Sequence, residues 1–360
     1  MAPKPLIDVR CAVCGEGAYE IIRTRGQVQT EVQYLRKFHQ RRLRPAKAES
    51  CSALLDRVEF TQDYATAIVS CHGCGLIYRN PRPPADAIKR AYERDHYGRD
   101  RLGKVFEAQR ELYRPKARYL GRWLPTREEQ RGTGTAPSPT CTRVVEVGSF
   151  VGGFLAAGRQ YGWDMLGVDP GKEVDSFCRE HELRVFQGTL AEAPIEPGSI
   201  DCVAIWNTFD QLPNPAPTLE AAGRVLRPGG VLALRVPNGD CFRFAESWMP
   251  RLPRPLRRWL RATVAWNNLL AFPYLHGYSV RTLDWLLFRY GFIRVSIQPD
   301  TLVRLSDDYT KTWAVWEERL LKSVCRVAFR LERWSSRSGV ILAPWFDAYY
   351  RRIDGTLDRE

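Results

Sequence analysis

The sequence lacks any long apolar segment. No run reaches the roughly eighteen apolar residues that a membrane-spanning helix needs. The segment MAPKPLIDVR at the N-terminus contains no apolar targeting stretch, and the chain has no internal repeats. We therefore expect a cytoplasmic globular protein with no transmembrane segment. Its 360 residues, 44% of them hydrophobic, suffice for one substantial core and a small second domain.

Acidic residues are outnumbered. The chain has 41 Asp and Glu against 54 Lys and Arg, which gives a net charge of +13. Basic residues gather in RKFHQRRLRPAK at 36–47 and in RLPRPLRRWLRATVAW at 251–266, and the second stretch has the pattern of an amphipathic helix. Arginine beside tryptophan can serve RNA, an anionic membrane surface or an anionic substrate. A solvated basic face or lid is the alternative, since neither stretch is a recognisable RNA-binding motif.

The GxGxxG spacing of a nicotinamide-binding site is also missing, although residues 143–170 follow the order strand, glycine-rich turn, helix, strand. We expect Gly148, Gly152 and Gly153 to leave room for a ligand against the backbone. Glu146 lies at the end of the first strand, where an acid favours a cationic ligand over a pyrophosphate. Asp169 ends the second strand about twenty residues beyond the glycines, where its carboxylate can accept hydrogen bonds from two ribose hydroxyls.

Two later segments continue the same pattern. SIDCVAIWNTFDQLPNP at 199–215 reads as a buried strand followed by a polar loop. VLRPGGVLALRVPN at 225–238 reads as a helix end, a Pro-Gly-Gly turn and another strand. Together these motifs span residues 141–300.

In these ordered motifs the sequence resembles the class I S-adenosylmethionine-dependent methyltransferases. The resemblance implies an α/β fold: a doubly wound, Rossmann-like, mostly parallel seven-stranded sheet with an antiparallel last strand. It also implies that S-adenosylmethionine is the cofactor, with Glu146 and Gly148 at its methionine end and Asp169 at its ribose. The residues expected to bind it are Glu146, Gly148, Ser149, Phe150, Gly152, Asp169 and Asn207. Phe150 departs from the family, which often has glycine at that place.

The expected catalytic residues are Asp210 and His276. Many relatives carry an acidic residue followed by histidine in the loop after the fourth strand, and the corresponding pair here is Asp210 and Gln211. The histidine is thus missing, so that a general base would be Asp210 or a residue from elsewhere, with His276 in FPYLHGYS as the outside candidate. The alternatives are that Asp210 caps the helix at 214–226, and that His276 caps a helix or bonds a loop carbonyl.

Two cysteine knuckles, CAVCG at 11–15 and CHGCG at 71–75, have the spacing of a closed tetrahedral zinc site. The expected ligands are Cys11, Cys14, Cys71 and Cys74. Closing the long loop between the knuckles costs only about 1 kcal/mol more than closing a usual one, against a contribution on the order of 10 kcal/mol from structural zinc. Cys51 and His72 are competing ligands, and buried reduced thiols are the alternative to a metal. Four thiolates leave no open position, so we expect Zn²⁺ to be structural.

The positions of glycine-, proline- and threonine-rich segments along the chain predict three regions. Residues 1–95 form a zinc-ribbon domain with a basic insert, and 96–140 form a helical segment that ends in the linker TREEQRGTGTAPSPT. Residues 141–360 form the S-adenosylmethionine-binding domain, with a lid insertion near 240–275.

The whole arrangement resembles bacterial zinc-ribbon methyltransferases that act on sugars or other small metabolites. We therefore expect methyl transfer to a small metabolite, sugar or glycan acceptor, with oxygen favoured and carbon as the alternative. One alternative is an rRNA or tRNA methyltransferase that grips RNA with its zinc ribbon and basic patches. Another is an inactive ligand-sensing subunit, suggested by Phe150 and Gln211. Contact with a membrane surface through 251–266 stays open, as does the oligomeric state.

Overall fold

A computed structural model describes residues 6–44, 66–93, 99–125, 141–266, 274–300, 310–335, 341 and 343–353. The chain divides into two compact units. Unit 1 consists of Met1–Pro84, Val236–Leu283 and Gln298–Asp347, and unit 2 of Ala85–Arg235, Asp284–Ile297 and Ala348–Glu360. The predicted linker at 126–140 and Cys51 lie outside the described residues.

Unit 2 is built on a seven-stranded sheet with the order β6-β5-β4-β7-β8-β11-β10. Its strands are β4 (Arg143–Val147), β5 (Asp164–Asp169), β6 (Val185–Gln187), β7 (Ile200–Trp206), β8 (Leu226–Pro237), β10 (Phe292–Asp300) and β11 (Trp345–Arg352). The pairs from β6 across to β8 are parallel, and the last strand of the chain, β11, is inserted between β8 and β10. The predicted fold class, a doubly wound and mostly parallel sheet, is confirmed.

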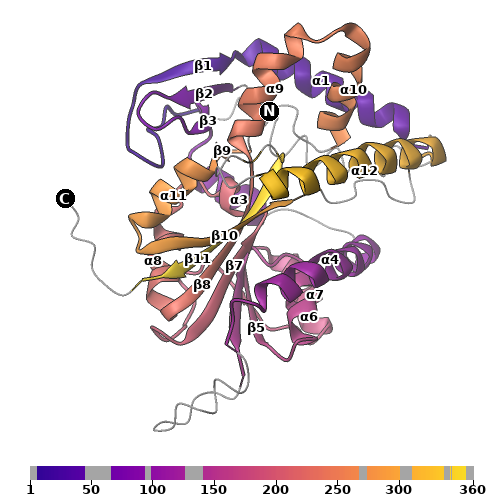
Figure 1. Ribbon diagram of the computed structural model, residues 1–360. Helices are drawn as coiled ribbons and strands as arrows, with labels where there is room; N and C mark the ends of the chain where they lie inside the picture. Colours follow the sequence, from indigo (N-terminus) through magenta and orange to yellow (C-terminus); the bar gives the residue numbers. More distant parts are fainter. Residues whose placement is uncertain are drawn as a thin grey trace. The chain divides into compact units, whose positions relative to one another are not determined.

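The central strands of this sheet are apolar because helices cover both faces. Every residue of β7 is buried, and so are four of the five residues of β4. In Figure 1, α4, α6 and α7 lie on one side of the sheet and α8 on the other. The helices of unit 2 are α3 (Ala85–Glu93), α4 (Arg99–Leu120), α6 (Gly153–Arg159), α7 (Lys172–Glu180) and α8 (Ala216–Val225).

Helix α4 packs closely against α6, which begins directly after the glycine-rich turn. A Cβ atom at Gly153 would lie 2.3 Å from Cβ of Gln109, so only glycine lets the two helices approach this far. Phe154 and Ala157 of α6 then join Tyr113 and Ala117 of α4 in one buried cluster. The close approach sets Tyr113 against the strand ends where the candidate site is found.

Unit 1 contains an antiparallel four-stranded sheet with the order β1-β2-β3-β9. Its strands are β1 (Tyr19–Arg23), β2 (Ala67–Cys71), β3 (Ile77–Asn80) and β9 (His276–Gly277). The two residues of β9 complete the sheet by pairing with Ile77 and Tyr78. The helices are α1 (Arg25–Arg42), α9 (Gly239–Trp248), α10 (Arg254–Trp266) and α12 (Thr312–Ser335), together with the start of α11 (Val280–Phe288).

The described part of segment 240–275 forms α9, the short 3-10 helix η3 (Met249–Arg251) and α10, and it belongs to unit 1. An ion pair between Arg23 and Glu246 ties α9 to β1, and Phe242 packs with Val28 and Val32 of α1. These contacts give the segment a firm attachment to the N-terminal part of the chain. The lid role and the predicted region boundaries stay predictions.

None of the helices in the described ranges combines the length and the apolar character that crossing a membrane requires.

Candidate functional site

The glycine-rich turn after β4 depends on close packing. Gly148 has φ +72°, and its N–H donates to the Val168 carbonyl at 2.8 Å. A Cβ atom there would lie 2.2 Å from Oγ1 of Thr208, in the loop after β7. At Gly152, with φ +75°, a Cβ atom would lie 2.5 Å from Leu183. Protein side chains occupy the Cβ direction at both α-carbons, so close packing requires these glycines. The room that we expect them to leave for a ligand against the backbone stays a prediction.

Asp169 holds the turn in place. Its Oδ2 accepts a hydrogen bond of 2.9 Å from the N–H of Phe150, and its Oδ1 accepts one of 2.8 Å from the N–H of Gly171. Phe150 has φ +46°, the left-handed conformation that glycine adopts more easily, and so the residue that departs from the family pattern is also the strained one. Each oxygen of Asp169 keeps a second lone pair, which leaves the carboxylate able to accept from two hydroxyls.

Glu146 and Ser149 present buried polar atoms to the same turn. Glu146 Oε2 and Ser149 Oγ have no hydrogen-bond partner among the described residues. Burial raises the pKa of Glu146 well above its ordinary value, and the carboxylate of Asp169 adds to the rise. A bound cation would offset both effects, because it favours the ionised form of each acid. These groups fit a ligand that carries positive charge and a ribose, as S-adenosylmethionine does.

The loop after β7 is braced by side-chain amides. Asn207 adopts a left-handed conformation with φ +57°, and its Nδ2 donates to the hydroxyl of Tyr113 at 3.2 Å. Gln211, which stands where relatives have histidine, donates from Nε2 to the Asn207 carbonyl at 2.6 Å. Gln211 therefore holds the shape of the loop instead of supplying a base.

Asp210 lies in the 3-10 helix η2 (Phe209–Gln211) at the end of β7 and is fully buried. Neither of its carboxylate oxygens has a hydrogen-bond partner among the residues that the structure describes. Burial raises the pKa of Asp210 from 3.8 to about 7, and its own backbone N–H and the charge of Arg235 oppose the rise. An acid with a pKa near neutrality can take up and release a proton under physiological conditions.

Arg235 was missed in the sequence analysis. It is buried on β8, next to β7 in the sheet, and its charge lowers the pKa of Asp210. The signal was present, because a charged residue inside the apolar strand VLALRVP requires a partner in the interior.

His276 lies on β9 of unit 1 and is not part of the sheet edge that carries Asp210. Its Nε2 is 2.9 Å from Nη1 of Arg82, which can only donate, so the remaining proton of the neutral ring sits on Nδ1. Burial lowers the pKa of His276 well below its ordinary value, and the Arg82 charge lowers it further. The ring is therefore neutral, and its role as a base stays a prediction.

The four knuckle cysteines come together in unit 1. Their Sγ atoms all lie within 4.8 Å of one another, and both Cys11–Cys74 and Cys14–Cys71 are 3.4 Å apart. Tetrahedral zinc with bonds of about 2.3 Å needs sulfur atoms about 3.8 Å apart, so small shifts would suffice. His72 is not part of this group of atoms.

The two knuckles have the same backbone geometry. Gly15 and Gly75 have φ values of +76° and +79°, and each donates its N–H at 2.9 Å to the carbonyl of the first cysteine of its knuckle. The N–H of Leu76 also donates to Sγ of Cys74 at 3.4 Å. The donor set of four thiols in paired tight turns fits structural zinc.

A comparison with protein families matches residues 99–297, more than half of the chain, to a methyltransferase domain. The match includes the glycine-rich turn, Asp169 and Asp210, and also α4, which covers α6.

Solved structures with a similar fold include methyltransferases from three organisms. A possible histamine N-methyltransferase from Thermotoga maritima is 16% identical, with a TM-score of 0.41, over 69% of this chain and 93% of that one. An S-adenosylmethionine-dependent methyltransferase from Archaeoglobus fulgidus is 17% identical, with a TM-score of 0.40, over 67% and 94%. A geranyl diphosphate C-methyltransferase from Streptomyces coelicolor is 16% identical, with a TM-score of 0.40, over 73% and 88%. Likenesses at this level do not identify an acceptor.

An uncharacterized protein in a transposon of Streptomyces fradiae is 33% identical over 81 residues. These residues are 21% of this chain and 24% of that protein, so the match spans about a quarter of the relative's length.

Proposed function

Because the chain belongs to the family of methyltransferase domains and is a methyltransferase, we propose that it transfers a methyl group from S-adenosylmethionine to an oxygen of a small metabolite, sugar or glycan. The acceptor class rests on the resemblance of the whole chain to zinc-ribbon methyltransferases of small metabolites. The preference for oxygen over carbon rests on Asp210.

The observation that carries the proposal is the buried carboxyl of Asp210, with a pKa of about 7 and with no hydrogen-bond partner among the described residues. A hydroxyl acceptor must lose its proton to become a good nucleophile, and a base with a pKa near the working pH removes it most effectively. A structural carboxylate would be expected to have donors on its oxygens.

The residues that would hold the cofactor follow from the turn after β4. Glu146 and Ser149 would bind its charged methionine end, and Asp169 would bind the ribose through its remaining lone pairs. S-adenosylmethionine supplies, when bound, an electrophilic methyl carbon attached to a sulfonium. The protein then has to place the acceptor oxygen in line with that carbon and to keep Asp210 within hydrogen-bond reach of the hydroxyl.

The proton is the part of the reaction that this chain's own residues handle. Asp210 would accept the proton of the acceptor hydroxyl as its oxygen takes the methyl group, whose bond to the sulfonium breaks and leaves the electron pair on sulfur. Asp210 would then release the proton to solvent. Arg235 tunes this step by opposing the effect of burial on the Asp210 pKa. Without that cation the carboxyl would stay protonated to a higher pH.

Zinc belongs to unit 1 in the proposal, where Cys11, Cys14, Cys71 and Cys74 would bind one ion. Four thiolates leave no coordination position for a substrate. Its role would be to hold the two knuckles, and with them the four-stranded sheet, in a single arrangement.

The test is transfer of a labelled methyl group from S-adenosylmethionine into the small-molecule, glycan and RNA fractions of a lysate, measured between pH 5 and 9. We expect the rate to rise with pH through about 7 and Asp210→Asn to lower it by about 10²- to 10⁴-fold. Asp169→Ala should abolish cofactor binding.

Asp201→Asn is the matched control, because Asp201 is a buried aspartate at the opposite end of β7, paired there with Arg227. It should leave both the rate and its pH dependence close to those of the unmodified protein. Label confined to RNA would contradict the acceptor class. A rate in Asp210→Asn equal to that of the control would contradict the role of Asp210.

A further inference from the structure

The helical hairpin formed by α9, η3 and α10 carries an exposed face of unusual composition. Four large apolar side chains, Phe244, Trp248, Leu256 and Trp259, are between 40% and 51% exposed. The rings of Phe244 and Trp248 lie 5.8 Å apart, so they form one apolar surface. Residues 247–266 contain five arginines and no acidic residue. On α10, Arg254 and Arg258 lie on the stripe opposite Leu256 and Trp259, as in an amphipathic helix. We call the exposed surface made by residues 244–259, with its apolar stripe and its arginine stripe, the arginine–tryptophan face.

The opposite side of the hairpin is attached to unit 1 by polar contacts. Arg243 donates to the Gly75 carbonyl at 2.7 Å, and Arg261 contacts Glu31 of α1 at 3.2 Å. The guanidinium of Arg261 also lies 4.0 Å from the centre of the Tyr34 ring. The hairpin is thus a fixed element, and its outward side chains are exposed because it is anchored through its inner side.

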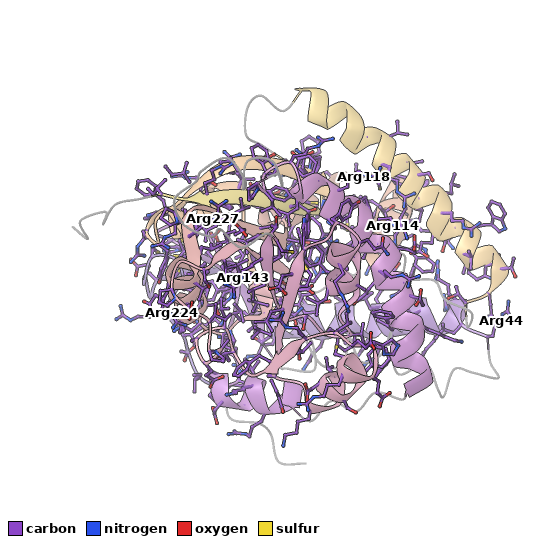
Figure 2. All side chains as sticks on the ribbon, turned by 90° about the horizontal axis from the view of Figure 1, so that it is seen from below. Arg44, Arg114, Arg118, Arg143, Arg224 and Arg227 are labelled. Atoms are coloured by element: carbon purple, nitrogen blue, oxygen red, sulfur yellow. The ribbon has the colours of Figure 1, made fainter. Side chains whose placement is uncertain are left out.

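Two arginines of this segment are not neutralised by an acidic neighbour, unlike several arginines of unit 2. Figure 2 labels Arg114, Arg143 and Arg227 in unit 2, each from a different element, and these three pair with Glu111, Asp164 and Asp201. Within the described ranges, Arg254 and Arg257 form no ion pair; Arg254 is exposed and Arg257 is half-buried. Their charges are therefore available to an anionic partner.

Helix α12 carries further exposed apolar side chains in unit 1. It packs against α10, and its Glu317 accepts a hydrogen bond of 2.8 Å from Nε1 of Trp266. Trp313, Trp316 and Leu320 of α12 are between 51% and 66% exposed. Arg319 lies 5.5 Å from the centre of the Trp316 ring, so an arginine and a tryptophan lie side by side on this helix.

We propose that the arginine–tryptophan face binds the surface of an anionic lipid bilayer. Tryptophan side chains favour the boundary between headgroups and acyl chains, and arginines on the same element attract anionic headgroups. A second copy of this chain fits less well, because docking through the same face would bring the arginines of both copies together. The inference is independent of the acceptor proposed above, since it concerns only where the protein binds.

The test is co-sedimentation of the full-length protein with vesicles of phosphatidylcholine alone and with vesicles of equal parts phosphatidylcholine and phosphatidylglycerol. We expect binding to the anionic vesicles, weakened by salt, and little binding to the neutral ones. Since one basic residue near an anionic surface changes the binding constant by roughly fivefold, Arg254→Glu with Arg257→Glu should weaken binding by about 25-fold or more. Trp248→Ser with Trp259→Ser should weaken it about tenfold.

Arg118→Glu with Arg281→Glu is the matched control, because both arginines are exposed, lie outside the hairpin, and give the same change in net charge. This variant should bind the anionic vesicles nearly as well as the unmodified protein. The proposal is overturned if the unmodified protein does not sediment with anionic vesicles, or if the control loses binding as strongly as the hairpin variant. Binding of a single-stranded RNA that depends on the same arginines, with no vesicle binding, would assign the face to nucleic acid instead. Circular dichroism of each variant shows whether weaker binding comes from the changed surface or from unfolding of the protein.

Discussion

Asp210 stabilises the folded protein less at neutral pH than at acidic pH. Its pKa is 3.8 in the ordinary state and about 7 in the folded protein, so that between these values the folded state retains a proton that the unfolded chain has released. The contribution of Asp210 to the free energy of unfolding is therefore complete below about pH 4 and is lost as the pH rises through 7.

Asp210→Asn removes this loss of stability at rising pH, because a side-chain amide does not titrate. We expect the variant to be more stable than the unmodified protein at pH 8 by a few kcal/mol, on the order of magnitude set by the pKa shift, and equally stable near pH 4. Urea unfolding at the two pH values measures the difference. A stability difference that does not change between them would show that Asp210 titrates normally. Replacing this one carboxyl would thus raise the stability at pH 8 and lower the activity.

Gly148 can be tested against a second glycine with the same backbone conformation. Gly148 has φ +72° and Gly198 has φ +66°, but only at Gly148 would a Cβ atom meet a neighbour, Oγ1 of Thr208 at 2.2 Å. Gly198→Ala should cost about 1 kcal/mol of stability through its backbone alone. Gly148→Ala should cost clearly more and should also abolish binding of S-adenosylmethionine, as measured by calorimetry. Equal effects of the two substitutions would mean that the turn tolerates displacement of the loop after β7.

At the level of elements, the paired knuckles allow a test of the metal. The geometry of Cys11, Cys14, Cys71 and Cys74 predicts one zinc ion per chain, measured by elemental mass spectrometry. Cys74→Ser should lower the zinc content to well below one and lower the unfolding temperature, since metal binding is coupled to folding. Cys325→Ala is the control, because Cys325 is buried on α12 outside the cluster and should leave the zinc content unchanged. Full zinc content in Cys74→Ser would rule out the four-cysteine site.

Four strands of the large sheet could be predicted because each carries its own signal. Parallel strands buried on both faces appear in the sequence as continuous apolar runs, and β4, β5, β7 and β8 all have one. Strand β9 has only two residues, His276 and Gly277, and it exists because β3 offers it a free edge. No local pattern indicates such a pairing, so the sequence placed His276 only before a helix.

The same distinction holds within the candidate site. Glu146, Gly148 and Asp169 were identified because a motif places them at known positions around a turn. The raised pKa of Asp210 could not be derived in the same way, because it depends on burial by several elements and on Arg235 of a neighbouring strand. The reason for the glycine at 148 was also hidden, since Thr208 comes from a loop sixty positions later.

At the scale of the whole molecule, the two compact units separate two kinds of chemistry. Unit 2 contains Glu146, Asp169 and Asp210, whose pKa values are raised by burial, and unit 1 contains the four cysteines and the arginine–tryptophan face. The segment that follows β8 leaves unit 2 and supplies α9 and α10 to unit 1. The chain thus returns to its N-terminal part before it completes the large sheet with β10 and β11.

This course of the chain predicts which segments lose protection from hydrogen exchange when the metal is removed. Arg243 of α9 donates to the carbonyl of Gly75, the residue directly after Cys74, so the knuckle is one of the anchors of the hairpin. Removal of zinc with a chelator should therefore increase hydrogen exchange in the amides of α9, Gly239–Trp248, as well as in the knuckles themselves. The amides of β4 and β7 in unit 2 should keep their protection, because their hydrogen bonds are made within the large sheet.

Arg243→Ala removes the contact with the Gly75 carbonyl but no zinc ligand, so it tests the contact separately from the metal. With zinc still bound, the variant should show faster exchange in α9 and unchanged exchange at Cys71–Gly75. If chelation left α9 as protected as before, the contact between Arg243 and Gly75 would contribute little to holding the hairpin. If β7 lost protection together with α9, zinc would stabilise the whole chain and not unit 1 alone. Measuring exchange in both units of the same sample decides among these outcomes, because the protection of β7 serves as the internal reference for that of α9.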